Sequence, residues 1–186
     1  NKWVNSKGMT FKVQAYNGNE TGHHDTIQNA TMVDIIEGES LAFMEIHNGI
    51  DSFRYLAGGA HMAGKQIISD ELAAVMGGAY NITVADVVSI ANKNAAGGVN
   101  RFILHGYPSE QVLGQSWPGY HAFDYMFTDP WEDRQPVWED VRIMTDYLSR
   151  TEMILQTGKA KVDIAVYRDI KYVKMPYIKN EALTDY

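Results

Sequence analysis

The chain has 186 residues, of which 45% are hydrophobic and 21% are charged, and its formal net charge is -7. No apolar run approaches the roughly 18–20 residues of a membrane-spanning helix, and the 16 Lys and Arg residues form no basic stripe typical of nucleic-acid binding. The absence of cysteine excludes disulfides, thiolate metal sites and a cysteine nucleophile. We therefore expect a globular domain that binds neither membrane nor nucleic acid.

Strand-like and helical segments alternate along the chain. Hydrophobic periodicity predicts, in order, a strand at Phe11–Tyr16, a loop at Asn17–Asn29, strand Met32–Ile36, helix Asp51–Met62, strand Gln66–Ser69, helix Val84–Ala96 and strand Arg101–Gly106. An aromatic-rich loop follows at Tyr107–Arg134, then helix Val137–Thr157 and strand Val162–Tyr167. This alternation is typical of βα units around a parallel sheet.

Polar side chains lie at or just after the predicted strand ends, namely Tyr16, Glu37, Glu39, Asp70, Glu71 and His105. In (β/α)8 barrels the carboxyl ends of the strands carry the catalytic residues. Four βα units form only half of such a barrel, which usually takes about 250 residues. We expect an α/β fold that is half of a (β/α)8 TIM-type barrel, a fragment of a larger protein. Residues 1–158 would form the half-barrel, and residues 159–186 the start of a following domain or a linker.

Glu71 is the principal catalytic candidate, because it lies just after the predicted strand at Gln66–Ser69, with only Asp70 between them. A carboxylate there suits a general base or a nucleophile. The alternative is an acid at a helix N-terminus that interacts with the helix dipole. Glu37 and Glu39 flank Gly38, and alternation places both on the same side. One of them would act chemically while the other orients it, or both would be solvated loop acids.

His105 ends an apolar strand and would contact a polar substrate or lie in the core. Trp117 belongs to the aromatic-rich loop, whose rings would stack on sugars or form a small core of their own. His61 is interpreted as structural, and the His23-His24-Asp25 run is a weak metal motif. Three Asn-x-Ser/Thr sequons, at Asn19, Asn29 and Asn81, favour a secreted glycoprotein over coincidence.

Seven segments in a fixed order resemble the latter half of glycoside hydrolase family 106, the α-L-rhamnosidases. They are Phe11–Tyr16, Asp34–Glu39, Ala60–Lys65, Ile68–Glu71, Gly98–His105, Trp117–Gly119 and Val162–Tyr167. No single segment is specific, but the ordered set is. The chain has Ser-Asp-Glu at residues 69–71, where the family pattern looks more like Ser-Ala-Glu.

The resemblance implies a (β/α)8 barrel whose last four strands lie in this chain, with Glu71 at the end of the seventh strand. The family is regarded as inverting and calcium-assisted, which would make Glu71 the general base that activates water. The general acid would then come from the fourth strand, before residue 1. Glu37 or Glu39 would bind substrate or calcium through oxygen ligands, and no organic cofactor is implied.

We therefore expect a secreted glycosidase that hydrolyses terminal α-L-rhamnosyl or related deoxy-sugar linkages in polysaccharides. Glu71 would act as base, with Glu37, Glu39, His105, Trp117 and Tyr16 in contact with the carbohydrate. The remainder of the polypeptide would complete the barrel. Two alternatives stay open: a non-catalytic carbohydrate-binding protein on a degenerate barrel, and a glycosidase of another barrel family such as the β-galactosidase-like enzymes.

Overall fold

The described residues contain one parallel sheet with helices packed against it. The computed structural model describes residues 1–14, 25–41, 53–77, 80–107, 113–114, 116, 127 and 131–165. The sheet has four strands in the order β1-β2-β3-β4, and each pairs in parallel with the next one along the chain. The strands are β1 (Lys12–Gln14), β2 (Ile35–Leu41), β3 (Ile68–Ala74) and β4 (Arg101–Leu104). The parallel α/β arrangement predicted from the sequence is confirmed.

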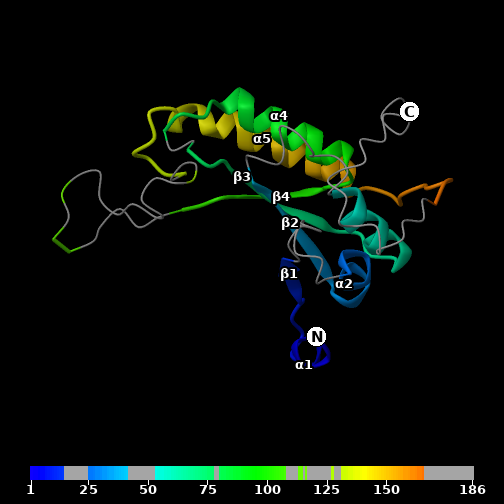
Figure 1. Cartoon of the computed structure of the whole chain (residues 1–186). Coiled ribbons are helices and arrows are strands. Elements are labelled where there is room, and N and C mark those ends of the chain that lie inside the picture. The colour runs from blue at the N-terminus through cyan, green and yellow to red at the C-terminus, as the bar shows by residue number, and fades with distance from the viewer. Residues whose placement is uncertain are drawn as a thin grey trace.

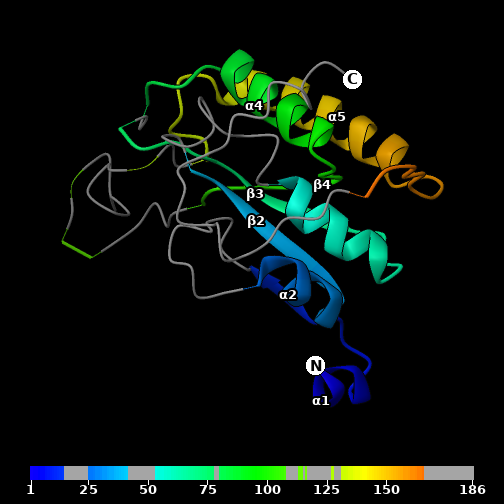
Figure 2. The same ribbon diagram turned by 45° about the vertical axis from the view of Figure 1, so that its right-hand side comes forward.

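Helices precede, separate and follow the strands in sequence. They are α1 (Lys2–Ser6), α2 (Thr26–Met32), a helix at residues 53–62, α4 (Val84–Ala96) and α5 (Trp138–Leu155). All of them except α1, which has no buried residue, pack against the sheet. Figures 1 and 2 show α4 and α5 side by side, with α4 against β3 and α5 against β4. The helix at 53–62 and α2 contribute to a core cluster with Ile36 and Ile68, and Leu72 joins a second cluster with α4 and α5.

The pleat of the strands divides their side chains between two faces, because successive residues point to opposite sides. On the helix-covered face lie Ile36, Gly38, Ser40, Ile68, Asp70, Leu72 and Phe102. On the opposite side, which we call the polar face, lie Lys12, Gln14, Glu37, Glu39, Ser69 and Glu71. One face of the same strands is therefore mainly core, and the other is mainly hydrogen-bonding and charged groups.

Helix α4 begins and ends where its sequence predicts. Thr83 is the N-cap, and its side chain and that of Asp86 form a reciprocal capping box. Val87 and Ala91 are buried against the sheet. After the helix, Gly98 has φ +108, and a Cβ there would lie 2.5 Å from the Cβ of Ala57. Glycine is thus required at Gly98 by both its backbone angle and its packing.

The glycines within the helix at 53–62 have different surroundings. A Cβ on Gly59 would lie 2.5 Å from the carbonyl oxygen of Ile27 and 2.8 Å from the Cβ of Ala30, whereas a Cβ on Gly58 would meet nothing within 4 Å. Gly59 therefore permits close approach of this helix to α2. The helix itself is confirmed over its described part, and Gly64 follows it at φ +68.

Several predicted boundaries are wrong. The loop predicted at Asn17–Asn29 contains the start of α2, because the Asp25 side chain accepts a hydrogen bond from Gln28 N and caps the helix. Met32 ends that helix, so the strand predicted at Met32–Ile36 begins only at Ile35.

The strand predicted at Gln66–Ser69 is β3, which continues to Ala74 because it is buried along almost its whole length. Helix α5 is shorter at both ends than the predicted Val137–Thr157. Residues 162–165 form no strand and are exposed, since no described strand pairs with them; 166 and 167 lie outside the described residues. Among the residues described, no helix has the length and apolar character needed to cross a bilayer.

Candidate functional site

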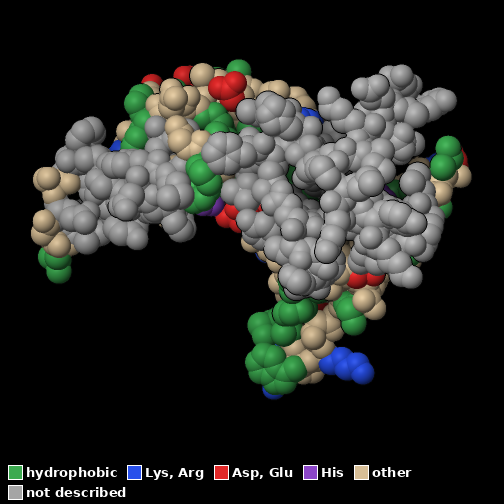
Figure 3. All heavy atoms as spheres, viewed as in Figure 1, with side chains coloured by type: hydrophobic (Ala, Val, Ile, Leu, Met, Phe, Trp, Pro, Cys, Tyr) green, Lys and Arg blue, Asp and Glu red, His purple; other side chains and the backbone are tan. Residues whose placement is uncertain are grey.

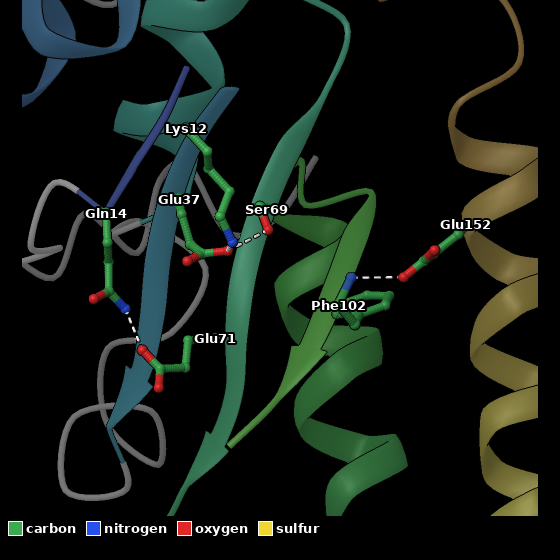
Figure 4. A network of polar contacts seen from close by, with 7 residues as sticks. All are labelled: Lys12, Gln14, Glu37, Ser69, Glu71, Phe102 and Glu152. Atoms are coloured by element: carbon green, nitrogen blue, oxygen red, sulfur yellow. Dashed lines mark hydrogen bonds and ion pairs between the residues drawn. The ribbon is translucent and has the colours of Figure 1, made fainter. Parts of the chain in front are cut away.

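Two carboxylates from neighbouring strands face each other across the polar face. Glu39 of β2 and Glu71 of β3 are register partners. Gln14 of β1 donates a hydrogen bond from Nε2 to Oε2 of Glu71 at 2.5 Å. Figure 4 shows the side chains of Gln14 and Glu71 on the same side of the sheet. Glu71 is the fourth residue of β3, whereas the sequence pattern predicts a position just after the end of the strand. The helix N-terminal alternative for Glu71 is therefore wrong.

Burial and two neighbouring groups act on the ionisation of Glu39. Partial burial raises the pKa of Glu39, the nearby charge of Glu71 raises it further, and His105 opposes both effects. Like charges in one site disfavour simultaneous ionisation. A carboxyl group whose pKa is raised by burial and by a neighbouring charge is a common feature of functional sites.

A second polar cluster lies on the same face, two residues closer to the amino ends of β2 and β3. Lys12 Nζ lies 2.5 Å from Oε2 of Glu37, and Ser69 Oγ donates to the same oxygen at 2.6 Å (Figure 4). Glu37 is 7% exposed, so these contacts neutralise and satisfy a buried carboxylate. The prediction that Glu37 and Glu39 share one side is confirmed, but only Glu39 lies beside Glu71.

His105 follows β4 directly and lies at the same end of the sheet. Its backbone N–H donates to the Leu72 carbonyl at 3.1 Å, and its ring packs edge-on against Phe127 with centroids 5.8 Å apart. His105 also lowers the pKa of Glu39, against the effects of burial and of Glu71. In the space-filling view, acidic side chains and a histidine reach the surface close together on this side of the molecule (Figure 3).

Asp70 occupies the opposite side of β3, although it precedes Glu71 in the chain. Its carboxylate is fully buried and accepts hydrogen bonds from Ser40 Oγ at 2.7 and 2.9 Å and from Asn94 Nδ2 at 2.8 Å. Asn94 belongs to α4 and also donates to Ser40 Oγ at 2.6 Å. Asp70 thus faces the helices rather than the polar face. Sequence reasoning missed this network, as well as the roles of Lys12, Gln14 and Ser69.

The remaining predicted site residues are dispersed or lie outside the described residues. Tyr16, Trp117 and Asn19 are in the undescribed part. Asn29 lies half-buried within α2, and Asn81 is exposed just before Thr83. The glycosylation of all three asparagines stays a prediction.

The histidines offer little evidence for a metal site. His61 is half-buried in the helix at 53–62, where desolvation lowers its pKa. His23 and His24 are outside the described residues, and Asp25 caps α2. Within the described ranges, no group of three or more His, Cys, Asp or Glu side chains is arranged to hold a metal ion.

Comparison with known proteins agrees with this architecture. The family model described as alpha-L-rhamnosidase, glycoside hydrolase family 106, matches residues 1–181. The chain belongs to glycoside hydrolase family 106. It is 28% identical over 171 residues to a Formosa agariphila protein named "Putative beta-glucuronidase", covering 86% of this chain and 13% of that protein.

A solved structure also resembles this member of family 106. The rhamnosidase from Novosphingobium sp. PP1Y aligns with a TM-score of 0.57 at 19% identity, over 72% of this chain and 13% of that one. This likeness supports the α/β fold. The chain spans about 13% of the length of each of these two relatives.

Proposed function

We propose that this chain forms the second half of the catalytic (β/α)8 barrel of a glycoside hydrolase, which cleaves terminal α-L-rhamnosyl or related deoxy-sugar linkages in polysaccharides with inversion. Membership of the rhamnosidase family supports the substrate class. Four parallel strands in sequential order, with helices between them, are what half of such a barrel contains. The rest of the barrel would come from sequence outside this chain.

The observation that carries the proposal is the register pairing of Glu39 and Glu71 on the polar face. We assign Glu71 as the general base: its carboxylate would take a proton from a water molecule as the oxygen attacks the anomeric carbon. Gln14, which donates to Oε2 of Glu71, would fix the orientation of that carboxylate. His105 and Glu39, beside it, would contact the sugar.

The geometry of the sheet also bears on the general acid. Adjacent strands lie about 4.8 Å apart, whereas inverting enzymes separate their two carboxyl groups by roughly 6.5–9.5 Å. A general acid from a strand that does not neighbour β3 would suit this separation better than Glu39. This supports a general acid located upstream of residue 1, on the other half of the barrel.

We also propose that the enzyme binds calcium, with Glu39 as the preferred ligand. Glu39 offers carboxylate oxygens, the ligands that calcium prefers, and a bound cation would oppose the effects of burial and of the Glu71 charge, which raise the pKa of Glu39. Glu37 fits less well because Lys12 and Ser69 already bind its carboxylate. Calcium takes six to eight ligands, so the described residues supply only part of such a site. When bound, calcium would hold and polarise substrate oxygens.

The cellular context follows from the same proposal. Sequons at Asn19, Asn29 and Asn81 support a secreted glycoprotein, and Asn81 has the exposed position that glycosylation needs. Tyr16 and Trp117 would provide aromatic contacts to the sugar, and residues 159–186 would lead into a following domain or linker.

The test compares Glu71→Gln with wild type in the full-length enzyme, with p-nitrophenyl α-L-rhamnoside as substrate. Loss of a general base typically lowers turnover about 10²–10⁴-fold, so we expect kcat to fall by at least that lower bound. The matched control is Glu152→Gln. Its carboxylate accepts from Phe102 N at 2.6 Å on the helical side of β4, so the same charge is removed away from the site (Figure 4).

Three outcomes decide the proposal. Turnover by Glu71→Gln within a few-fold of the control would exclude Glu71 as base. Activity on an aryl β-glucuronide but not on the rhamnoside would replace the substrate class by the one in the name of the Formosa relative. An axial or equatorial anomeric proton in the first product, read by NMR, would decide between inversion and retention.

A further inference from the structure

We propose that Asp70 is a positioning residue for the Glu39–Glu71 pair, and that it acts from the opposite side of the sheet through Ser40 and Asn94. The inference rests on the proposed function, because it concerns how that site is held. It begins from an unusual placement: a fully buried carboxylate stands directly between Ser69 and Glu71, two residues of the polar face.

The strand pairing becomes irregular immediately beyond the carboxylate pair. Glu39 pairs with Glu71, but the next register pair is Leu41 with Ala74, so one residue of β2 opposes two of β3. Such a bulge re-aims the side chains around it. Ala73, within the bulge, has φ +66, a left-handed conformation that is unfavourable for a non-glycine residue. Strain of this kind persists only where surrounding contacts hold it.

Asp70 contacts the residue of β2 that lies opposite this bulge. Ser40, the single β2 residue opposite the bulge, donates its hydroxyl to Asp70, and Asn94 binds Asp70 and Ser40 together. The network therefore ties β2 to β3 one residue from Glu39 and one residue from Glu71. It also ties both strands to α4.

The hydrogen-bond donors around position 70 favour a carboxylate over an amide there. Ser40 and Asn94 both direct donors at Asp70, while Oδ1 of Asn94 has no hydrogen-bond partner within the described structure. An amide at position 70 would offer one acceptor oxygen and would direct its own N–H groups at another donor. Since a buried unsatisfied polar group is unfavourable, the strands would shift, and the spacing of Glu39 and Glu71 would change with them.

The experiment uses the full-length enzyme with Asp70→Asn, the exchanged pair Asp70→Asn/Asn94→Asp, and Asn100→Ala as the matched control. Asn100 is also buried and binds the β3 backbone, accepting from Ile68 N at 2.9 Å and donating to the Gln66 carbonyl at 2.7 Å. It lies at the amino end of β3, away from Glu71. Steady-state kinetics give kcat and KM, and hydrogen exchange reports the opening of residues 35–41 and 68–74.

Misplacement of a catalytic group by about 1 Å can lower turnover roughly 100-fold. We expect Asp70→Asn to lower kcat by about 10- to 100-fold with a small change in KM, and the exchanged pair to recover most of that loss. Asn100→Ala should melt at a lower temperature but keep its kcat. Faster exchange in Asp70→Asn should occur near Glu39 and Glu71, and in Asn100→Ala near Ile68.

Equal effects of Asp70→Asn and Asn100→Ala on kcat, or unchanged exchange at the carboxyl ends of β2 and β3, would overturn the positioning role. If wild-type enzyme hydrolyses no aryl glycoside, the proposed function fails instead. The exchange measurement then still decides whether Asp70 holds the two strands in register.

Discussion

The two faces of the four-stranded sheet are built from alternate residues of the same strands, yet they serve different purposes. On the helix-covered face, Ile36, Ile68 and Leu72 are at most 1% exposed. On the polar face, Glu39 and Glu71 remain partly exposed and carry the candidate chemistry. A rigid, buried side is what allows the opposite side to hold two carboxylates in a fixed relation. We therefore expect that, of two residues adjacent in sequence, substitution of the buried one lowers stability and substitution of the one on the polar face lowers activity.

We expect the largest difference in the free energy of unfolding between substitutions at Leu72 and at Glu71. Leu72 is fully buried in the second core cluster, so Leu72→Ala should lower the free energy of unfolding by about 2–5 kcal/mol. Glu71→Gln keeps the size of the side chain, and an amide still accepts from Gln14, so its effect on unfolding should stay within about 1 kcal/mol. Denaturant unfolding of the full-length enzyme measures both. A larger stability loss for Glu71→Gln would contradict the division between the faces.

Gly58 and Gly59 provide a second comparison of neighbouring residues, one tightly packed and one not, within the helix at residues 53–62. Gly59→Ala would place a Cβ against Ile27 and Ala30 of α2, and overpacking of this kind costs about 1–3 kcal/mol. Gly58→Ala has no such contact and should stabilise the helix by about 0.5–1 kcal/mol. Melting temperatures that move in the same direction in both variants would show that helix 53–62 does not approach α2 as closely as described.

Much of this arrangement could be predicted from the sequence. The capping residues Thr83 and Asp86 and the stop at Gly97 define α4, because helix ends depend on local hydrogen bonds. The shared side of Glu37 and Glu39 follows from the two-residue period of a strand. Both features depend on residues close together in the chain.

Other features depend on partners far along the chain, so the sequence alone could not indicate them. The burial of Asp70 requires Ser40 and Asn94, which are 30 and 24 residues away. The role of Gln14 requires Glu71, 57 residues later. The Val162–Tyr167 segment has a strand-like pattern, but a strand also needs a neighbour to pair with, and its described residues have none. Pairing partners were the missing information in each case.

The smallest expected effect concerns the cluster beneath the carboxylate pair. Lys12 is 39% exposed at its side chain and Glu37 is 9% exposed, so their ion pair lies between a surface and a buried bridge. A double-mutant cycle with Lys12→Met and Glu37→Gln should give a coupling energy of about 1 kcal/mol. Lys65 and Asp34, whose charged atoms are 3.8 Å apart with both side chains at least 25% exposed, provide the matched cycle with Lys65→Met and Asp34→Asn. Their coupling should be smaller and should vanish at high salt, because exposed charges are screened. Equal couplings would mean that the polar face is as accessible to solvent as the outer surface, and that Glu37 needs no neutralising partner.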